Sequence, residues 1–357
     1  MSRIGEILQR GRAERLFSGA AWSVGTADAE LDGGCLGTLA WDGDPVSDDT
    51  LWDLASVTKP IAGLALMALI DDGHLLLDDP IARYLPEFTA SDKAVLTIRE
   101  LLTHTSGIPG QIPLYRWCHT PAELVAAIRD VPVAHAPGQR VIYSSQGFIV
   151  LGLVAEALTE TRLDKIIANR VTGPAGMSET RFRLSEADQT RAAATEDCPW
   201  RGRLVQGTVH DENAEVMGGV AAHAGLFAPI ADLARLGRIL CRGGGLDSGA
   251  GFDSGRPLLS PAAFTTMITP ATDHLPLRRC LAWQGRDRVN SPAGDLLGPR
   301  AYGHTGFTGT SLWADPELGG YVALVTNRVH PARESRGFDR VRRVVHNVAA
   351  RMLSTAS

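Results

Sequence analysis

The chain has 357 residues, of which 44% are hydrophobic and 21% are charged. This length allows a large hydrophobic core, and the composition is that of a globular protein. The formal net charge of −5 gives no electrostatic reason to expect a nucleic-acid, membrane-surface or acidic-polymer partner.

The five cysteines are scattered and form no CxxC pair, so we expect reduced thiols rather than a disulfide framework or a zinc site. The first ten residues mix charged and apolar side chains, without the continuous apolar stretch of a secretory signal. No segment is long and apolar enough to span a bilayer. These features predict a cytoplasmic protein.

The amino-terminal part of the chain combines helix and strand signals. Apolar residues at helical spacing predict a helix over residues 3–17. Two apolar runs predict strands at Ala20–Val24 and Leu36–Trp41, joined by a turn at Gly33-Gly34. Helical spacing returns at 61–70.

The rest of the chain is mainly helical until strands return near its carboxyl end. Residues 75–200 are punctuated by Pro and Gly, and Phe148–Leu158 is apolar on nearly all sides, which predicts a buried helix. Ser311–Ala314 and Tyr321–Thr326 predict two strands, and Phe338 begins a final helix. Strands at both ends with helices between them favour a single sheet with a helical insertion.

Ser56-Val57-Thr58-Lys59 carries the central chemical signal. Residues three apart on a helix share one face, so the Ser56 hydroxyl and the Lys59 amine are expected within reach of each other. Pro60 is tolerated only near a helix start, which places Ser56 at the amino end of the 61–70 helix. There the helix dipole and free N–H groups favour negative charge. A desolvated lysine can activate a serine as a nucleophile.

An SxxK tetrapeptide on its own is a weak signal, but other motifs accompany it. Tyr143-Ser144-Ser145 precedes the buried helix, and His304-Thr305-Gly306 precedes a predicted strand. Glu100–Gly107 (ELLTHTSG) and Gly218–Phe227 lie between them. In this order and at these separations, the motifs resemble those of the serine β-lactamase and penicillin-binding-protein superfamily. The resemblance is to its class C, DD-peptidase and family VIII esterase branch.

The resemblance implies an α/β (α+β) fold of the β-lactamase/transpeptidase type. In that fold an antiparallel sheet is flanked by amino- and carboxyl-terminal helices, and a mainly helical domain is inserted. On this chain the sheet domain would comprise residues 1–75 and 205–357, and the helical domain residues 76–204. The active site is expected in the cleft between them.

The family's catalytic roles transfer motif by motif. Ser56 would form the acyl-enzyme and Lys59 would accept its proton. Tyr143 would act with Lys59 as a general base, or return a proton to the leaving group. His304 would assist Tyr143 and the substrate. The backbone N–H groups of Ser56 and Phe307 would form the oxyanion hole.

Further residues are expected to contact the substrate. These are Ser145, Thr305 and Gly306 of the second and third motifs. Trp117 and Trp200, which lie in irregular, proline-flanked segments, are candidate pocket residues. The resemblance implies no metal and no organic cofactor.

Two residues depart from the family's usual motifs. Ser145 stands where an Asn usually binds the amide of a β-lactam or peptide, and a hydroxyl cannot offer the same hydrogen-bonding pattern. His304 replaces a Lys, which removes a permanent cation from the carboxylate-binding side. The sequence therefore favours esters, or an ester- or amide-bearing metabolite, over penicillins and D-Ala-D-Ala peptides.

Several polar residues outside the three motifs have two interpretations. His210-Asp211-Glu212 could bind a metal or substrate, but a His-Asp pair lacks the other ligands of a zinc site, and a hydrogen-bonded loop at the rim is favoured. His104 and His223 are expected to be structural. The Gly/Asp/Ser-rich stretch at 243–255 is predicted to be a loop.

The sequence thus predicts a serine acyl hydrolase with a small-molecule acyl substrate, active on esters or weakly on β-lactams. The main alternative is an acyltransferase of small-molecule biosynthesis, in which an amine or alcohol replaces water. A D-aminopeptidase and a non-catalytic binding homologue are further alternatives, and the intact motifs oppose the last. Hydrolase and transferase would use the same residues, so the sequence does not separate them.

Overall fold

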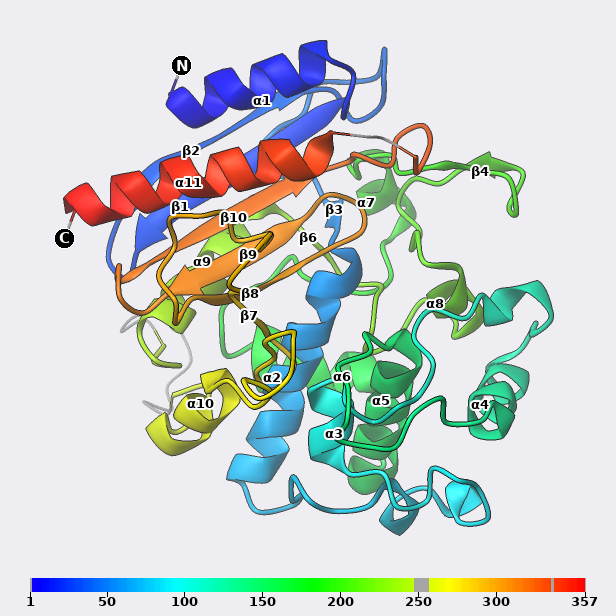
Figure 1. The fold of residues 1–357 in the computed structure, drawn as a ribbon. Coiled ribbons are helices and arrows are strands. Elements are labelled where there is room, and N and C mark those ends of the chain that lie inside the picture. Colours follow the sequence, from blue (N-terminus) through cyan, green and yellow to red (C-terminus); the bar gives the residue numbers. More distant parts are fainter. Residues whose placement is uncertain (1, 247–256, 335–336, 357) are drawn as a thin grey trace.

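The computed structural model describes residues 2–246, 257–334 and 337–356 (Figure 1). Its centre is a six-stranded antiparallel sheet in the order β2-β1-β10-β9-β8-β7. The strands are β1 (Gly19–Thr26), β2 (Glu30–Gly37), β7 (Gln284–Gly285), β8 (Tyr302–Thr305), β9 (Ser311–Asp315) and β10 (Gly320–Thr326). Strands from the two ends of the chain therefore pair side by side, as the sequence predicted.

Helices cover both faces of this sheet. The terminal helices α1 (Arg3–Ala13) and α11 (Phe338–Ala356) lie across one face, and α9 (Ile230–Cys241) packs on the other (Figure 1). Apolar side chains of the two terminal helices bury against Trp313 of the sheet. This is the predicted fold class, an antiparallel sheet flanked by terminal helices, although α1 ends at Ala13 rather than at residue 17.

The other helices gather beside one edge of the sheet. They are α2 (Thr58–Asp71), α3 (Ile98–Leu102), α4 (Pro121–Asp130), α5 (Ser145–Thr159), α6 (Leu163–Ile167), α7 (Glu186–Thr190), α8 (Glu212–Val216) and α10 (Pro261–Ile268). Two short strand pairs join loops, β3 (Trp52–Asp53) with β6 (Phe227–Ala228) and β4 (Asp197–Cys198) with β5 (Arg203–Leu204). All six strands of the main sheet come from outside residues 76–204.

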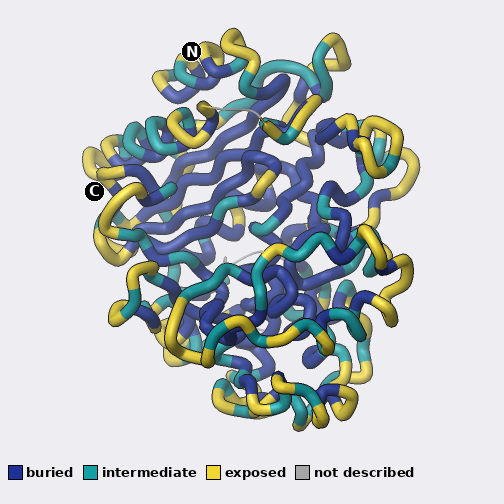
Figure 2. The backbone as a smooth tube through the Cα atoms, turned by 45° about the vertical axis from the view of Figure 1, so that its right-hand side comes forward, coloured by how far each residue is buried: buried dark blue, intermediate teal, exposed yellow. Residues whose placement is uncertain are grey.

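One hydrophobic core connects the sheet with the helical region. Ala21 of β1 and Val325 of β10 belong to the same buried cluster as Val150 of α5. The backbone is buried along the central strands and again within the helical region (Figure 2). α2 lies within this cluster, and every residue from Thr58 to Leu69 is buried. A helix that is buried on all sides keeps its polar side chains away from water. The amino group of Lys59 is one of these buried groups.

The predicted strand at Leu36–Trp41, with its turn at Gly33-Gly34, is wrong. Both glycines lie inside β2, where Gly34 is opposite Trp22 of β1. A Cβ on Gly34 would come within 3.0 Å of the Trp22 ring. Glycine is needed at this position because the indole of the neighbouring strand occupies the space of a side chain. In the sequence, such a glycine cannot be told from a glycine in a turn.

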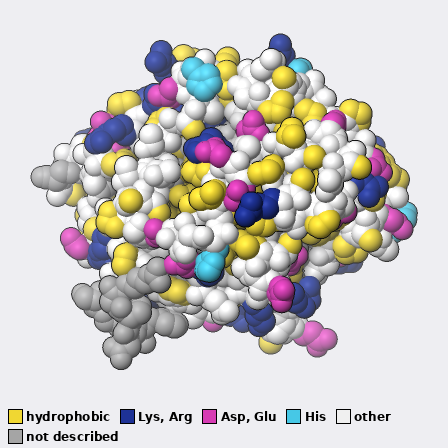
Figure 3. Space-filling model, turned by 90° about the horizontal axis from the view of Figure 1, so that it is seen from below, with side chains coloured by type: hydrophobic (Ala, Val, Ile, Leu, Met, Phe, Trp, Pro, Cys, Tyr) yellow, Lys and Arg dark blue, Asp and Glu magenta, His cyan; other side chains and the backbone are white. Residues whose placement is uncertain are grey.

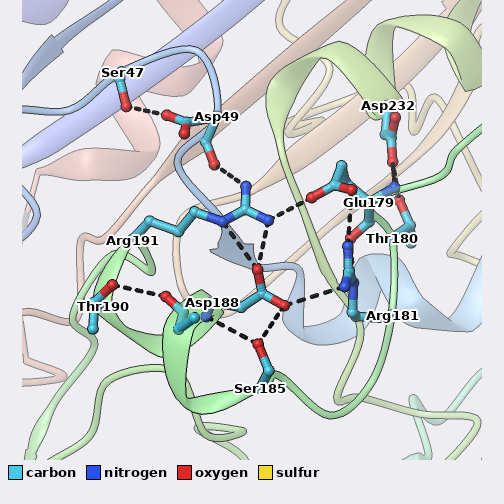
Figure 4. A network of polar contacts seen from close by, with 11 residues as sticks. Ser47, Asp49, Glu179, Thr180, Arg181, Ser185, Asp188, Thr190, Arg191 and Asp232 are labelled. Carbon is cyan, nitrogen blue, oxygen red and sulfur yellow. Dashed lines mark hydrogen bonds and ion pairs between the residues drawn. The ribbon is translucent and has the colours of Figure 1, made fainter.

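A polar network ties the end of the helical region to the sheet domain (Figure 4). Arg191 donates to the Asp49 carbonyl at 2.7 Å, to the Asp188 carboxylate at 2.8 Å and to Glu179. Asp232 of α9 accepts a hydrogen bond from the Thr180 hydroxyl at 2.8 Å. These contacts fix the chain before it returns to the sheet.

The molecular surface is mixed in charge on the face seen from below. Basic and acidic side chains are interspersed among apolar ones over the described part of this face (Figure 3). Within the described ranges, no helix combines the length and apolar character needed to cross a membrane. Most of the loop predicted at 243–255 lies outside the described residues.

Asn327, just after β10, joins four backbone segments. Its Nδ2 donates to the Ser18 hydroxyl and to the carbonyls of Leu39 and Ala194, at 2.8, 3.1 and 3.0 Å. Its Oδ1 accepts the N–H groups of Ser18 and Gly19 at 3.1 and 3.0 Å. The side chain is buried, and without it the Ser18 and Gly19 N–H groups and the Ala194 carbonyl would lose these hydrogen bonds.

We expect Asn327→Ala to lower the free energy of unfolding by about 2–4 kcal/mol, because several buried polar groups would lose their partners. Denaturant unfolding followed by circular dichroism measures the change. Ser354→Ala, at the exposed end of α11, is the control and should leave stability unchanged. Equal stability of Asn327→Ala and the wild type would contradict this role.

Candidate active site

Ser56 lies in a short 3-10 helix, η1 (Ala55–Val57), directly before α2. Ala55 has a φ of +45°, a conformation that costs energy for a residue with a side chain. Its N–H donates to the Asp53 carboxylate at 2.7 Å, which holds the turn in place. The turn presents the Ser56 hydroxyl at the start of α2, as the sequence predicted.

The amino group of Lys59 is fully buried beside Ser56. Its Nζ lies 3.2 Å from Ser56 Oγ, 3.1 Å from the His223 carbonyl and 3.5 Å from Ser145 Oγ. Burial lowers the pKa of Lys59 from 10.5 to about 7, against the opposing effect of the Asp211 charge. A large fraction of Lys59 is therefore neutral at neutral pH and able to accept the Ser56 proton.

Tyr143 is positioned by the ELLTHTSG segment. The His104 carbonyl accepts the Ile142 N–H at 2.8 Å, and His104 Nδ1 accepts the Ser144 N–H at 3.1 Å. The His104 ring packs against the Tyr143 ring with centroids 4.6 Å apart. His104 is thus a structural residue, as expected, and it holds the second motif on both sides of Tyr143.

The Tyr143 hydroxyl is suited to donating a proton. Burial raises the pKa of Tyr143 well above its ordinary value, and the hydrogen bond with the Ser56 side chain offsets this only in part. The hydroxyl therefore stays protonated at neutral pH. Of the two roles expected for Tyr143, the structure favours returning a proton to the leaving group.

His304 lies on β8 across the site from Tyr143. Its Nδ1 donates to the Thr305 carbonyl at 2.9 Å, and the ring centroids of His304 and Tyr143 are 6.1 Å apart. Burial lowers the pKa of His304 to about 3, and the positive charge of Lys59 acts in the same direction. His304 is therefore neutral, with Nε2 as a hydrogen-bond acceptor.

The turn after β8 is fastened to the segment that carries Ser56. Thr308 Oγ1 donates to the Asp53 carbonyl at 2.7 Å, and Thr310 Oγ1 donates to the Leu54 carbonyl at 2.9 Å. A Cβ on Gly306 would lie 2.5 Å from that Leu54 carbonyl. Glycine is required at Gly306 because the two segments approach so closely.

This fastening holds two free backbone donors together. The N–H groups of Ser56 and Phe307 have no acceptor among the described residues. They come from two segments that the threonine hydrogen bonds hold in contact, and they stay the predicted donors of the oxyanion hole.

Two cavities meet at Ser56, Gln111 and Phe307. The larger, which we call the arginine cavity, has a volume of about 310 Å³ and also contains Tyr143 and His304. The other, which we call the acidic cavity, has a volume of about 230 Å³ and lies on the opposite side of Ser56. A surface groove of about 590 Å³ along α4 is larger, but none of the expected catalytic residues lines it.

The arginine cavity contains cations that sequence reasoning missed. The guanidinium groups of Arg279, Arg328 and Arg342 all line it. His304 itself supplies no permanent cation, but other segments bring positive charge to this side of the site. Each arginine is isolated in an irregular or helical segment, so the sequence did not indicate that the three would line one cavity.

Arg279 lies close to the catalytic groups. Its side chain is 9% exposed and donates to the Arg278 carbonyl at 2.8 Å. It has no ion-pair partner among the described residues. Burial lowers the pKa of Arg279, although the guanidinium still remains charged at neutral pH. A buried, unpaired cation in a cavity favours an anionic ligand group.

The acidic cavity contains Asp211, whose role the sequence left open. Asp211 accepts hydrogen bonds from His223 Nε2 at 2.9 Å and from the Ala214 N–H at 2.8 Å. Burial raises the pKa of Asp211, but His223 and the Lys59 charge together hold it well below its ordinary value. The same His223 accepts the Lys59 hydrogen bond through its carbonyl, so Asp211 helps to place the base.

The neighbouring acidic residues form an ion-pair network. The donor atoms of Glu196, Cys198 and Glu212 lie within 4.8 Å of one another, as in some metal sites. However, Arg333 binds the carboxylates of both Glu196 and Glu212, and His210 Nε2 lies 3.0 Å from Glu196. The guanidinium already occupies the place of a cation. This favours the hydrogen-bonded rim over a metal site.

The remaining predicted substrate residues separate into two groups. Ser145 lines the acidic cavity, and Thr305 and Gly306 line the arginine cavity. Trp117 and Trp200 line neither cavity and are 54% and 43% exposed. The prediction that these two tryptophans line the pocket is therefore not supported.

The fold and the site agree with the serine β-lactamase and penicillin-binding-protein superfamily. Residues 6–346 match the family model described as Beta-lactamase, and the chain belongs to this family. It is 32% identical over 312 residues to the putative D-alanyl-D-alanine carboxypeptidase of Escherichia coli (strain K12). That alignment covers 79% of this chain and 70% of the relative.

Solved structures share the fold along almost the whole chain. EstCE1, a hydrolase with promiscuous acyltransferase activity, superposes with a TM-score of 0.75 at 20% identity and covers 97% of both chains. A variant of simvastatin synthase from Aspergillus terreus has a TM-score of 0.75 at 19% identity, covering 99% of this chain and 95% of that one. At such identities the likeness shows the fold alone.

We expect Tyr143→Phe to lower kcat/KM for an alkyl ester by about 10²–10⁴-fold, because the leaving alkoxide would lose its proton donor. A p-nitrophenyl ester should lose much less, since its leaving group departs without a proton. Steady-state kinetics on both esters measures the difference. Tyr84→Phe, whose hydroxyl binds Asp79 outside the site, is the control. Equal losses for the two esters would contradict the donor role.

Proposed function

We propose that this protein is a serine acyl hydrolase that forms an acyl-enzyme on Ser56, with a carboxylate-bearing leaving group in the arginine cavity. The observation that carries the proposal is the buried, unpaired Arg279 guanidinium in the same cavity as Ser56 and Tyr143. This adds an anionic group to the ester- or amide-bearing substrate that Ser145 and His304 led us to expect.

Acylation begins with the neutral Lys59. It removes the Ser56 proton as the oxygen attacks the substrate carbonyl. Negative charge then develops on the carbonyl oxygen, and the N–H groups of Ser56 and Phe307 stabilise it. The helix dipole of α2, which starts two residues after Ser56, acts in the same direction.

The position of the proton donor orients the substrate. Tyr143 lines the arginine cavity and not the acidic cavity, so the departing oxygen or nitrogen must lie on the arginine side. The acyl group then remains on the acidic side, next to Ser145. The name of the E. coli relative, a putative D-alanyl-D-alanine carboxypeptidase, describes release of a carboxyl-terminal residue, which is a leaving group of this kind.

Hydrolysis completes the cycle when water attacks the acyl-enzyme from the vacated arginine cavity. In acylation, the protonated Lys59 returns the Ser56 proton to Tyr143 after Tyr143 has protonated the leaving group. In hydrolysis, these groups take a proton from the attacking water and return one to Ser56 as the acyl bond breaks. An amine or alcohol bound in that cavity would instead give acyl transfer, which remains the second candidate function. The fold likeness to EstCE1 and simvastatin synthase supports keeping it.

We expect the acetyl ester of 3-hydroxybenzoate to be hydrolysed with a kcat/KM about 10–100-fold above that of the acetyl ester of 3-hydroxybenzamide, because only the former offers a carboxylate to Arg279. The two esters have nearly the same shape. Arg279→Gln should abolish the difference mainly by slowing the carboxylate ester. Spectrophotometric rates and intact-protein mass spectrometry of the acyl adduct measure these effects.

Ser56→Ala is the control for the reaction itself. It should abolish turnover of both esters and the mass adduct, while circular dichroism stays unchanged. An adduct on Ser56→Ala would refute the nucleophile. Equal rates for the two esters in the wild type would refute the carboxylate-bearing leaving group.

A further inference from the structure

A second pair of cations lies in the arginine cavity. Arg328 follows β10, and its Nε donates to the Phe307 carbonyl at 2.7 Å, with the guanidinium 4.6 Å from the centre of the Phe307 ring. Arg342 comes from α11, is 6% exposed, and lies 4.9 Å from the centre of the Phe338 ring. Both side chains are held by aromatic rings and line the same cavity as Ser56.

The pair carries more positive charge than its surroundings neutralise. Asp339 accepts a hydrogen bond from Arg342 Nη1 at 3.1 Å, but its side chain is 87% exposed and therefore screened by water. Within the described ranges, neither arginine forms another ion pair. The Nε of Arg342 is buried and has no hydrogen-bond acceptor. Two guanidinium groups thus share one solvent-exposed carboxylate.

This pair lies apart from Arg279 in the sheet. Burial lowers the pKa of Arg342 to about 10, and the Arg328 charge contributes in the same direction. Arg279 is bridged to Gln284 of β7, whereas Arg328 follows β10, and β8 and β9 lie between these two strands. The cavity therefore has one cationic centre beside the catalytic tyrosine and another beside Phe307 and α11.

We propose that Arg328 and Arg342 bind a second anionic group on the leaving group, beyond the carboxylate at Arg279. This inference rests on the proposed function, because it assumes that the leaving group occupies the arginine cavity. Planar guanidinium groups bind carboxylate and phosphate through paired hydrogen bonds, and an anion would relieve the repulsion between the two arginines. The leaving group then carries two anionic groups, as in a dicarboxylic or phosphorylated amino acid.

A binding experiment on Ser56→Ala tests this without turnover. Isothermal titration calorimetry would compare N-acetylglutamate with N-acetylglutamine, as both enantiomers, and N-acetyl-O-phosphoserine with N-acetylserine. In at least one pair, we expect the ligand with two anionic groups to bind about 10-fold or more tightly than its monoanionic partner. The two pairs distinguish a carboxylate from a phosphate as the second anion.

Matched variants assign the effect to the proposed residues. In the Ser56→Ala background, Arg328→Gln should remove the preference for the ligand with two anionic groups, because it should weaken N-acetylglutamate more than N-acetylglutamine. Arg342→Lys, which keeps the charge but not the paired donors, should reduce the preference in part. Arg340→Gln, an exposed position of the same helix, should have no effect.

The outcomes separate this inference from the proposed function. Equal affinities within both pairs, or an Arg328→Gln variant that weakens both members of a pair equally, would overturn the second anion subsite. If the ligand with two anionic groups binds more tightly and Arg328→Gln removes this preference, the subsite is supported even if wild-type protein forms no acyl adduct. In that case the proposed hydrolase activity alone would fail.

Discussion

The buried amino group of Lys59 is the constraint on which the site depends. α2 packs between the sheet and the helical region, so every side chain in its first three turns is buried, including that of Lys59. Among the described residues, no carboxylate forms an ion pair with this amino group. A charged lysine is costly in such a place, which makes the neutral base available where Ser56 needs it.

Lys93 shows what the fold does with a buried lysine that has a counter-ion. Its amino group is equally inaccessible, but it pairs with Asp92 at 2.6 Å and donates to the backbone carbonyls of Arg129 and Val131. Lys59 has instead a hydroxyl on either side and one carbonyl. Both lysines are equally buried, so what distinguishes them is whether a carboxylate forms an ion pair with the amino group.

The other catalytic groups are arranged around this base by contacts from distant segments. Thr308 and Thr310 fasten the turn after β8 to the backbone before Ser56, and His104 holds Tyr143 from the helical region. The site thus lies where sheet and helices meet, and neither part could form it separately. Charge then divides the site into an arginine side and an acidic side with Ser56 between them.

Local signals in the sequence were sufficient for the parts of the structure that depend on short-range chemistry. The spacing of Ser56 and Lys59, the apolar run of α5 and the strands β9 and β10 were all predicted from neighbouring residues. Gly33-Gly34 misled because its cause is a tryptophan on another strand.

Arg279, Arg328 and Arg342 gave no signal for a related reason. Each is a single cation in a segment without a motif, and only the tertiary fold brings the three to one cavity. The pKa of Lys59 was likewise beyond reach, because it depends on burial by elements from most of the chain. Motifs therefore identified the reacting groups, whereas the charge of the substrate cavity required the structure.

The most direct test is the protonation state of Lys59. The sequence contains three lysines, Lys59, Lys93 and Lys165, so protein labelled with ¹³C-lysine gives few side-chain resonances to follow by NMR as pH changes. Lys59→Met, an apolar replacement of similar length, assigns the resonance by its loss. We predict that this resonance titrates near pH 7, as expected for a pKa of Lys59 lowered to about 7. Titration near the ordinary lysine value of about 10.4 would show a charged Lys59 at neutral pH, and would contradict its role as the base.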